Sequence, residues 1–168
     1  MTWPTEPSAT ARLELLPLRV GHADEMAGVL SDPALHAFTG GAPDTPEALR
    51  ARYERLVAGS PDPGVLWCNW VLRERATGSL VGTVQATVSG ETAEVAWVVG
   101  TPWQGRGYAV EAARSLVRHV IRAYPVRTVV AHVHPGHHAS AAVAAAAGLT
   151  ATGELHDGEI RWELTVRR

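Results

Sequence analysis

The residues best suited to chemistry form a short glycine-rich turn. This turn consists of Gln104, Gly105, Arg106, Gly107, Tyr108 and Ala109, between a strand-like and a helix-like segment. Glycine lets a backbone approach a ligand closely and can adopt positive φ. The first N–H groups of a helix have no partner within it, and the aligned peptide dipoles add partial positive charge there. The pattern therefore predicts a site for a ligand that carries phosphate or pyrophosphate.

Two common nucleotide-binding loops do not fit this turn. A P-loop requires Gly-Lys-Ser/Thr, and the chain contains no lysine. The dinucleotide fingerprint requires a third glycine where Val110 stands, and an acidic residue about 20 positions further on. No acidic residue lies near the end of the next expected strand. A different phosphate-bearing ligand is therefore expected.

Gln104, Gly107 and Ala109 match the pattern Gln-x-x-Gly-x-Ala. This resembles the acetyl-CoA-binding motif of the GNAT superfamily of amine N-acetyltransferases, where it lies between a long strand and an amphipathic helix. Residues 92–99 are strand-like here, and 110–124 carry apolar residues at helical spacing. The resemblance implies that all six residues of the turn bind acetyl-CoA.

The elements that must position this turn follow one another in mixed order. Strands are expected over 12–18, 65–74, 79–88, 92–99, 126–133, 151–155 and 159–166. Helices are expected over 23–30, from Pro46 after a Thr45 cap to Val57, and over 110–124 and 139–147. Short turns favour antiparallel pairing, whereas the long helical connection after Val99 predicts a parallel pair. The expected fold is α+β, with a mixed, mostly antiparallel sheet of about seven strands and helices on both faces.

This order resembles the GNAT fold from end to end, and most closely the RimJ/RimL type of ribosomal-protein N-terminal acetyltransferases. The segments that carry the likeness are 11–40, 73–84, 104–109 and 132–149. Matches to the family's Pro-x-Asn-x-x-Ser…Gly-Leu/Phe signature are Pro135, Ser140, Gly148 and Leu149. His137 stands where the family usually has asparagine, so the resemblance implies a coenzyme contact there with an unusual side chain.

The resemblance also implies roles in acyl transfer. The backbone of Val98 and Val99 is expected to contact the acyl and pantetheine groups. The attacking amine must be neutral, although alkylamines are mostly protonated near pH 7. Glu94 is the candidate general base, acting through water, or else a surface carboxylate. Many family members protonate the leaving thiolate with a tyrosine, but Ala144 occupies that position here, so Ser140 is the candidate proton donor. Alternatively, Ser140 is expected to cap its helix or to bind the coenzyme.

Composition limits the other possibilities. The 168 residues, 46% of them hydrophobic, suit one domain over 1–168, with a flexible N-terminus over 1–11. A net charge of −2 argues against nucleic acid, and the absence of a long apolar run argues against a membrane. The single Cys68 suits a reducing compartment, so the expected location is cytoplasmic. Four histidines lie close together, but no cysteine or carboxylate completes a metal site: His132, His134, His137 and His138.

The sequence thus predicts an acetyl-CoA-dependent N-acetyltransferase that acts on a protein N-terminus or a small-molecule amine by direct attack in a ternary complex. The loop 32–44 and the hairpin 153–159 are expected to border the acceptor, and the protein to be a monomer or homodimer. One alternative is a non-catalytic acyl-CoA-binding or regulatory module of the same fold. Another is transfer of a larger acyl group such as succinyl.

Overall fold

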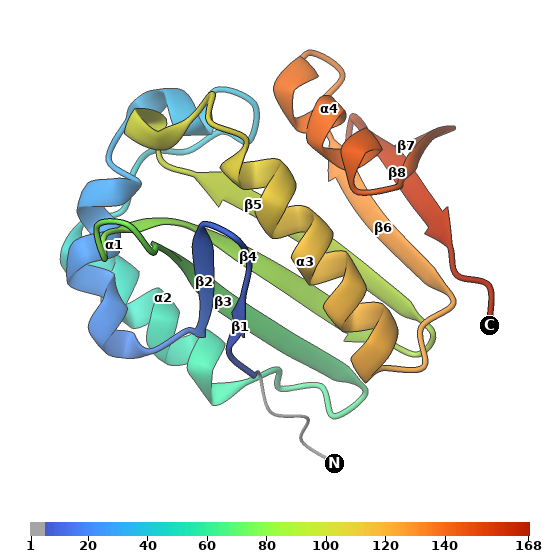
Figure 1. The fold of residues 1–168 in the computed structure, drawn as a ribbon, viewed down its shortest axis with the longest axis horizontal. Coiled ribbons are helices and arrows are strands. Elements are labelled where there is room, and N and C mark those ends of the chain that lie inside the picture. Colours follow the sequence, from blue (N-terminus) through green and yellow to red (C-terminus); the bar gives the residue numbers. More distant parts are fainter. Residues whose placement is uncertain (1–5) are drawn as a thin grey trace.

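Eight strands form one mixed sheet in the computed structural model, which describes residues 6–168 (Figure 1). The strands are β1 (Ser8–Ala9), β2 (Leu13–Pro17), β3 (Val65–Glu74), β4 (Leu80–Ser89), β5 (Thr92–Val99), β6 (Thr128–Val133), β7 (Thr150–His156) and β8 (Glu159–Thr165). Their order in the sheet is β1-β2-β3-β4-β5-β6-β8-β7. The mixed sheet with helices makes the fold α+β, which confirms the predicted class.

Helices lie on both faces of this sheet. The α-helices are α1 (Ala23–Val29), α2 (Pro46–Ala58), α3 (Tyr108–Ala123) and α4 (His138–Ala146), and the short 3-10 turns are η1 (Val20–His22), η2 (Pro33–His36) and η3 (Thr101–Trp103). In Figure 1, α3 and α4 lie in front of the sheet and α1 and α2 lie behind it. Two separate apolar cores result: Leu116 and Val120 of α3 are buried in one, and Met26 of α1 is buried in the other.

The pairing of β5 with β6 is the feature that shapes the site. It is parallel, as predicted, while every other strand pair among the described residues is antiparallel. The register covers only Thr92–Glu94 of β5 and Thr128–Val130 of β6. Beyond Glu94 the two strands diverge (Figure 1). The second half of β5 therefore has no neighbouring strand on its β6 side.

The helix start predicted at Thr45 is confirmed in detail. The Thr45 side chain accepts a hydrogen bond from the Ala48 N–H at 3.1 Å, and Pro46 takes the first helical position. Pro46 suits this position because its missing N–H would have no partner within the helix. At the end of a different helix, α3, Tyr124 is extended before Pro125, which stops that helix.

The N-terminal segment differs from the flexible terminus expected over residues 1–11. Residues 1–5 lie outside the described part, but Ser8 and Ala9 form β1 by pairing with Leu15 and Glu14 of β2. The Trp70 indole N–H also donates to the Glu6 carbonyl at 2.7 Å. A two-residue strand has no periodicity of its own, so its hydrogen bonds to β2 could not be read from the sequence. None of the described helices is both long and apolar enough to cross a bilayer.

Candidate active site

The glycine loop, residues 104–109, connects η3 to the start of α3. Gly105 has φ +78° and Gly107 has φ +80°, a left-handed conformation that favours glycine. Gly107 is the N-cap of α3, and no described side chain caps that end of the helix. The first hydrogen bond within the helix runs from the Glu111 N–H to the Gly107 carbonyl, at 3.1 Å. The N–H groups of the first turn are therefore available to an anion, as the glycine pattern predicts.

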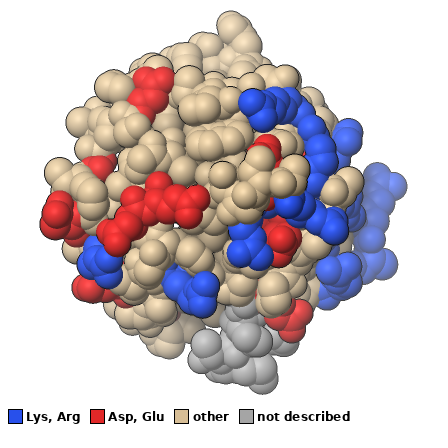
Figure 2. Space-filling view, turned by 60° about the vertical axis from the view of Figure 1, so that its left-hand side comes forward, with Lys and Arg blue, Asp and Glu red and all other residues tan. Residues whose placement is uncertain are grey.

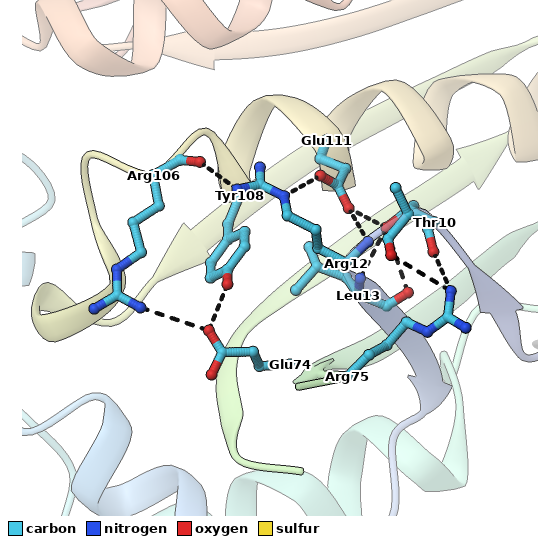
Figure 3. A network of polar contacts seen from close by, with 9 residues as sticks. Thr10, Arg12, Leu13, Glu74, Arg75, Arg106, Tyr108 and Glu111 are labelled. Atoms are coloured by element: carbon cyan, nitrogen blue, oxygen red, sulfur yellow. Dashed lines mark hydrogen bonds and ion pairs between the residues drawn. The ribbon is translucent and has the colours of Figure 1, made fainter. Parts of the chain in front are cut away.

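A network of polar contacts centred on the buried Glu74 and Tyr108 holds this loop against the sheet (Figure 3). The Tyr108 hydroxyl donates to the Glu74 carboxylate at the end of β3, and Arg106 lies 3.6 Å from the same carboxylate. Arg12 donates to the Arg106 carbonyl at 2.8 Å and pairs with Glu111 at 2.8 Å. The side chains of Arg106 and Tyr108 thus brace the loop, which leaves mainly their backbone for a ligand.

Electrostatics favour a charged Glu74 within this network. Glu74 is only 5% exposed, and hydrogen bonds from Thr77 and Tyr108 hold the pKa of its carboxyl below the ordinary value. The same bond to Glu74, followed by burial, raises the pKa of the Tyr108 hydroxyl. Glu74 lies in the segment 73–84 that carried the family likeness, but nothing in the sequence pairs it with Tyr108.

Gln104 joins the loop to the strand that precedes it. Its side-chain amide donates to the Val99 carbonyl at 2.9 Å. The amide therefore braces the loop, in addition to any contact with a ligand. Gln104 and Tyr108 together fix the two ends of the glycine loop to β5 and β3.

Backbone alternation decides which residues of β5 face the divergence from β6. The Gly100 N–H donates to the Val81 carbonyl of β4, and the Val98 carbonyl lies where a Cβ at Gly82 would have to sit. Because backbone groups alternate in direction along a strand, those of Val99 and Trp97 point towards β6. The Val98 backbone, for which a coenzyme contact is expected, is thus turned to β4, whereas that of Val99 points towards the divergence. The apolar pattern of a strand does not show which of two successive residues turns its backbone N–H and C=O towards a given neighbouring strand.

Glu94 lies at the last rung of the β5–β6 pairing. Its side chain is 55% exposed, and its Oε1 lies 2.9 Å from Nδ1 of His132 on β6. Directly opposite residues of neighbouring strands share a face, and the register places Thr87 and Trp67 in line with Glu94. We call this surface the polar sheet face, and its residues are Trp67, Asn69, Gln85, Thr87, Glu94 and His132. The sequence indicated Glu94 as a candidate base, but it did not pair Glu94 with His132.

His137 acts as the N-cap of α4. Its Nδ1 accepts a hydrogen bond from the Ser140 N–H at 3.3 Å. This geometry requires the neutral ring, and burial, followed by the charges of His134 and His138, lowers the pKa of His137. A histidine therefore fills the capping position that asparagine commonly takes. The alternative in which the Ser140 side chain caps the helix is wrong, because Ser140 is the donor residue in the third helical position.

The loop 32–44 reaches across to α4 through one aromatic side chain. Phe38 stacks on His137, with ring centroids 4.6 Å apart, and lies 5.0 Å from the ring of His134. On the other side, His156 of the β7–β8 hairpin lies 4.9 Å from the ring of His132. Both segments expected to border an acceptor therefore contact residues around the divergence of β5 and β6.

A recess of about 380 Å³ adjoins the first turn of α3. Its lining residues are Thr10, Ala11, Arg12, Gly107, Val110, Glu111, Arg114 and Arg118. Arginines gather on one side of the molecule (Figure 2), and three of them line this recess. Positive charge is thus available beside the helix N-terminus. Across residues 6–168, no three His, Cys, Asp or Glu side chains come together as metal ligands.

Solved structures identify the class of fold. An acetyltransferase of the GNAT family from Bacillus anthracis superposes with a TM-score of 0.82 at 16% identity, over 95% of this chain and 98% of that one. RimL, a ribosomal L7/L12 α-N-protein acetyltransferase in complex with coenzyme A, gives 0.78 at 16%, over 96% and 98%. Spermidine N-acetyltransferase from Vibrio cholerae, in complex with CoA and spermine, gives 0.76 at 14%, over 93% and 96%. The protein shares the acyl-CoA N-acyltransferase fold of these enzymes.

The family follows from the sequence comparison. Residues 12–150 match the model of the acetyltransferase (GNAT) domain. This match spans most of the chain, so the protein belongs to the GNAT family of acetyltransferases. No curated protein sequence matches the chain significantly.

Proposed function

We propose that this protein, acting as a single domain, transfers an acetyl group from acetyl-CoA to a primary amine by direct attack in a ternary complex. One observation carries the proposal: the pairing of β5 with β6 ends at Glu94, and the unpaired half of β5 then leads through η3 into the glycine loop and the N-terminus of α3, which no described side chain caps. At this junction, backbone groups of β5 can pair with the extended pantetheine arm of the coenzyme. The first N–H groups of α3 can bind the phosphates of the coenzyme. The residues present therefore fit a coenzyme with an anionic end and an amide-bearing arm.

The loop and the helices around it have separate roles in holding the donor. The backbone of residues 104–109 binds pyrophosphate, while Arg114 and Arg118 supply charge to further phosphates. The N–H of Val99, whose carbonyl is engaged by Gln104, and the backbone of Trp97 pair with the arm. His137 lies at the N-terminus of α4, on the opposite side of the divergence, and contacts the coenzyme from there. Acetyl-CoA supplies the thioester carbonyl, and a β5 N–H stabilises the charge that develops on its oxygen.

The polar sheet face receives the amine. The incoming ammonium loses its proton to Glu94 through water, and the neutral nitrogen forms the new N–C bond as the C–S bond breaks. The proton that the attacking nitrogen then sheds passes to solvent, as does the one that Glu94 took up. The thiolate is protonated by solvent, or by Ser140, which regains its proton from solvent. Serine is a weak acid, so positioning of the coenzyme is the main role of Ser140.

Two kinds of acceptor agree with the relatives. A protein N-terminus corresponds to the substrate named for RimL, and a polyamine corresponds to that of spermidine N-acetyltransferase. The acceptor enters between the loop 32–44 and the hairpin 153–159. Both kinds of substrate present a primary amine, which is the group that Glu94 deprotonates in this proposal.

Two alternatives have support in particular residues. A non-catalytic acyl-CoA-binding module is favoured by Ala144, which is fully buried and replaces the tyrosine that many relatives use. Transfer of a larger acyl group such as succinyl depends on room beside Val98 and Val99. Retention of Glu94 at the strand divergence favours catalysis over binding alone.

The test follows release of the coenzyme thiol with a panel of peptides, polyamines and aminoglycosides. Acetyl-CoA and succinyl-CoA serve as donors, and calorimetry measures the binding of each. We expect turnover with acetyl-CoA and at least one primary amine. Tight acetyl-CoA binding without turnover on any acceptor supports the binding module. Failure to bind acetyl-CoA contradicts the proposal as a whole.

A further inference from the structure

The contact between Glu94 and His132 has a consequence for acyl transfer. The two side chains come from neighbouring strands and meet at the point where the pairing of β5 and β6 ends. Glu94 is 55% exposed, whereas His132 is 14% exposed. The histidine is thus the fixed member of the pair, and the carboxylate is the member that a substrate can reach.

Neighbouring elements hold the imidazole of His132 in place. The ring of His156 on β7 lies 4.9 Å away, tilted by 35°. On β8, Arg161 stands opposite His132 in the register and Glu163 stands opposite Val130. Arg161 pairs with Glu163 at 2.5 Å and with Glu154 at 3.6 Å. Its charge is therefore engaged on β7 and β8, and the structure gives His132 as the partner of Glu94.

We propose that His132 is a positioning residue for Glu94: its Nδ1–H donates to Oε1, which turns Oε2 towards the acceptor amine. This inference rests on the proposed function. A hydrogen bond from the imidazole N–H to the carboxylate fixes the rotamer of Glu94. Glu94 projects from a strand into solvent on a flexible side chain, so without this bond its carboxylate samples several orientations. The His132 ring takes no proton from the substrate in this arrangement.

Activity measurements separate positioning from general damage. In His132→Ala we expect kcat to fall about tenfold, with the acceptor KM and the affinity for acetyl-CoA unchanged. His132→Asn places an amide N–H near the position of Nδ1 and should restore much of the activity. In a Glu94→Gln background, His132→Ala should add little further loss, because the two residues act as a unit. An equal loss in both backgrounds contradicts the proposal.

A spectroscopic test is independent of turnover. The ¹⁵N signals of the His132 ring report which nitrogen carries the proton, and we expect the Nδ1–H tautomer in the unmodified protein. Glu94→Ala should shift the ring towards the Nε2–H tautomer. An unchanged tautomer overturns the proposal even where an acceptor is acetylated. A shifted tautomer in a protein that acetylates no acceptor leaves the pair intact and contradicts the proposed function instead.

Discussion

The glycine loop and the polar sheet face differ in how their polar groups are held. Around the loop, Glu74 is buried, accepts hydrogen bonds from Thr77 and Tyr108, and forms an ion pair with Arg106. On the sheet face, Glu94 is largely exposed and has one histidine partner. A rigid cradle suits a donor whose coenzyme part never varies, and an open face suits acceptors of different size. The molecule therefore has rigid support beside the proposed coenzyme site and an open surface where we propose that the acceptor binds and reacts.

The largest effect is expected from a substitution in the glycine loop, the rigidly held region. Gly107→Trp places a bulky residue at φ +80° in the glycine loop, where Arg12 is already 3.3 Å from a Cβ. We expect the affinity for acetyl-CoA, measured by calorimetry, to fall by about 100-fold or more, since strain and blocked N–H groups act together. Gly59→Trp is the matched control, because Gly59 has φ +88° but open space around it. Equal losses in both variants count against the loop as the coenzyme site.

The next largest effect is expected from a substitution on the polar sheet face, the open region. Glu94→Gln keeps the shape of the side chain but removes its capacity to take a proton, so we expect kcat to fall about 100-fold. The affinity for acetyl-CoA should stay unchanged, since Glu94 lies outside the glycine loop. Glu91→Gln, which removes an exposed carboxylate paired with Arg127, is the control and should keep full activity. Unchanged turnover in Glu94→Gln contradicts the assignment of the base.

A milder change tests whether bracing matters for binding. Tyr108→Phe deletes the hydroxyl that donates to Glu74 and loosens the start of α3. We expect about tenfold weaker acetyl-CoA binding and little change in the acceptor KM. Tyr53→Phe is a matched control, because the buried Tyr53 hydroxyl has no hydrogen-bond partner among the described residues. If both variants bind equally well, the network serves folding alone.

Phe38 links the loop 32–44 to His137 at the N-terminus of α4, so its removal tests how far donor and acceptor binding are independent. Phe38→Ala deletes the stacking on His137 and frees the loop 32–44. We expect the acceptor KM to rise roughly two- to tenfold, as for loss of one aromatic pair. Acetyl-CoA affinity should change less. Val57→Ala, at an exposed apolar position on α2, is the control; a larger change in donor affinity than in acceptor KM means that Phe38 belongs to the donor side.

The smallest effect concerns the cap of α4. The pKa of His137 is lowered in the folded state. As the pH falls below about 6.5, the ordinary pKa of histidine, the unfolded chain therefore binds more protons at this residue than the folded protein does. The contribution of the cap is complete above that pH and is lost as the pH falls through the folded pKa, at a cost of about 1 kcal/mol. His22 and His119 also have a lowered pKa and act with the same sign.

Comparison with His137→Asn isolates this contribution, because asparagine caps the helix without titrating. Urea unfolding between pH 7.5 and about 5 should show a smaller loss of stability in His137→Asn than in the unmodified protein. Parallel curves for the two proteins mean that the cap does not depend on the charge of His137.

Much of the fold was readable from local patterns. Alternation and helical spacing predicted β2 to β8 and all four α-helices, and Thr45-Pro46 predicted the start of α2 to the residue. The long helical connection predicted the parallel pair. These features depend on neighbours within a few residues or on chain connectivity, which the sequence contains directly. The strand β1 was missed because two residues are too few to show the alternation of apolar and polar side chains that marks a strand.

The sequence by itself determined the glycine loop, the order of elements and the family, because each depends on residues close together in the chain. Tertiary structure decided the partners. Tyr108 meets Glu74 across 34 positions, and Glu94 meets His132 across 38. It also decided that the Val99 backbone, and not that of Val98, faces the diverging strand. Pairing of distant side chains and the phase of a strand depend on register, which is set only when the whole sheet assembles.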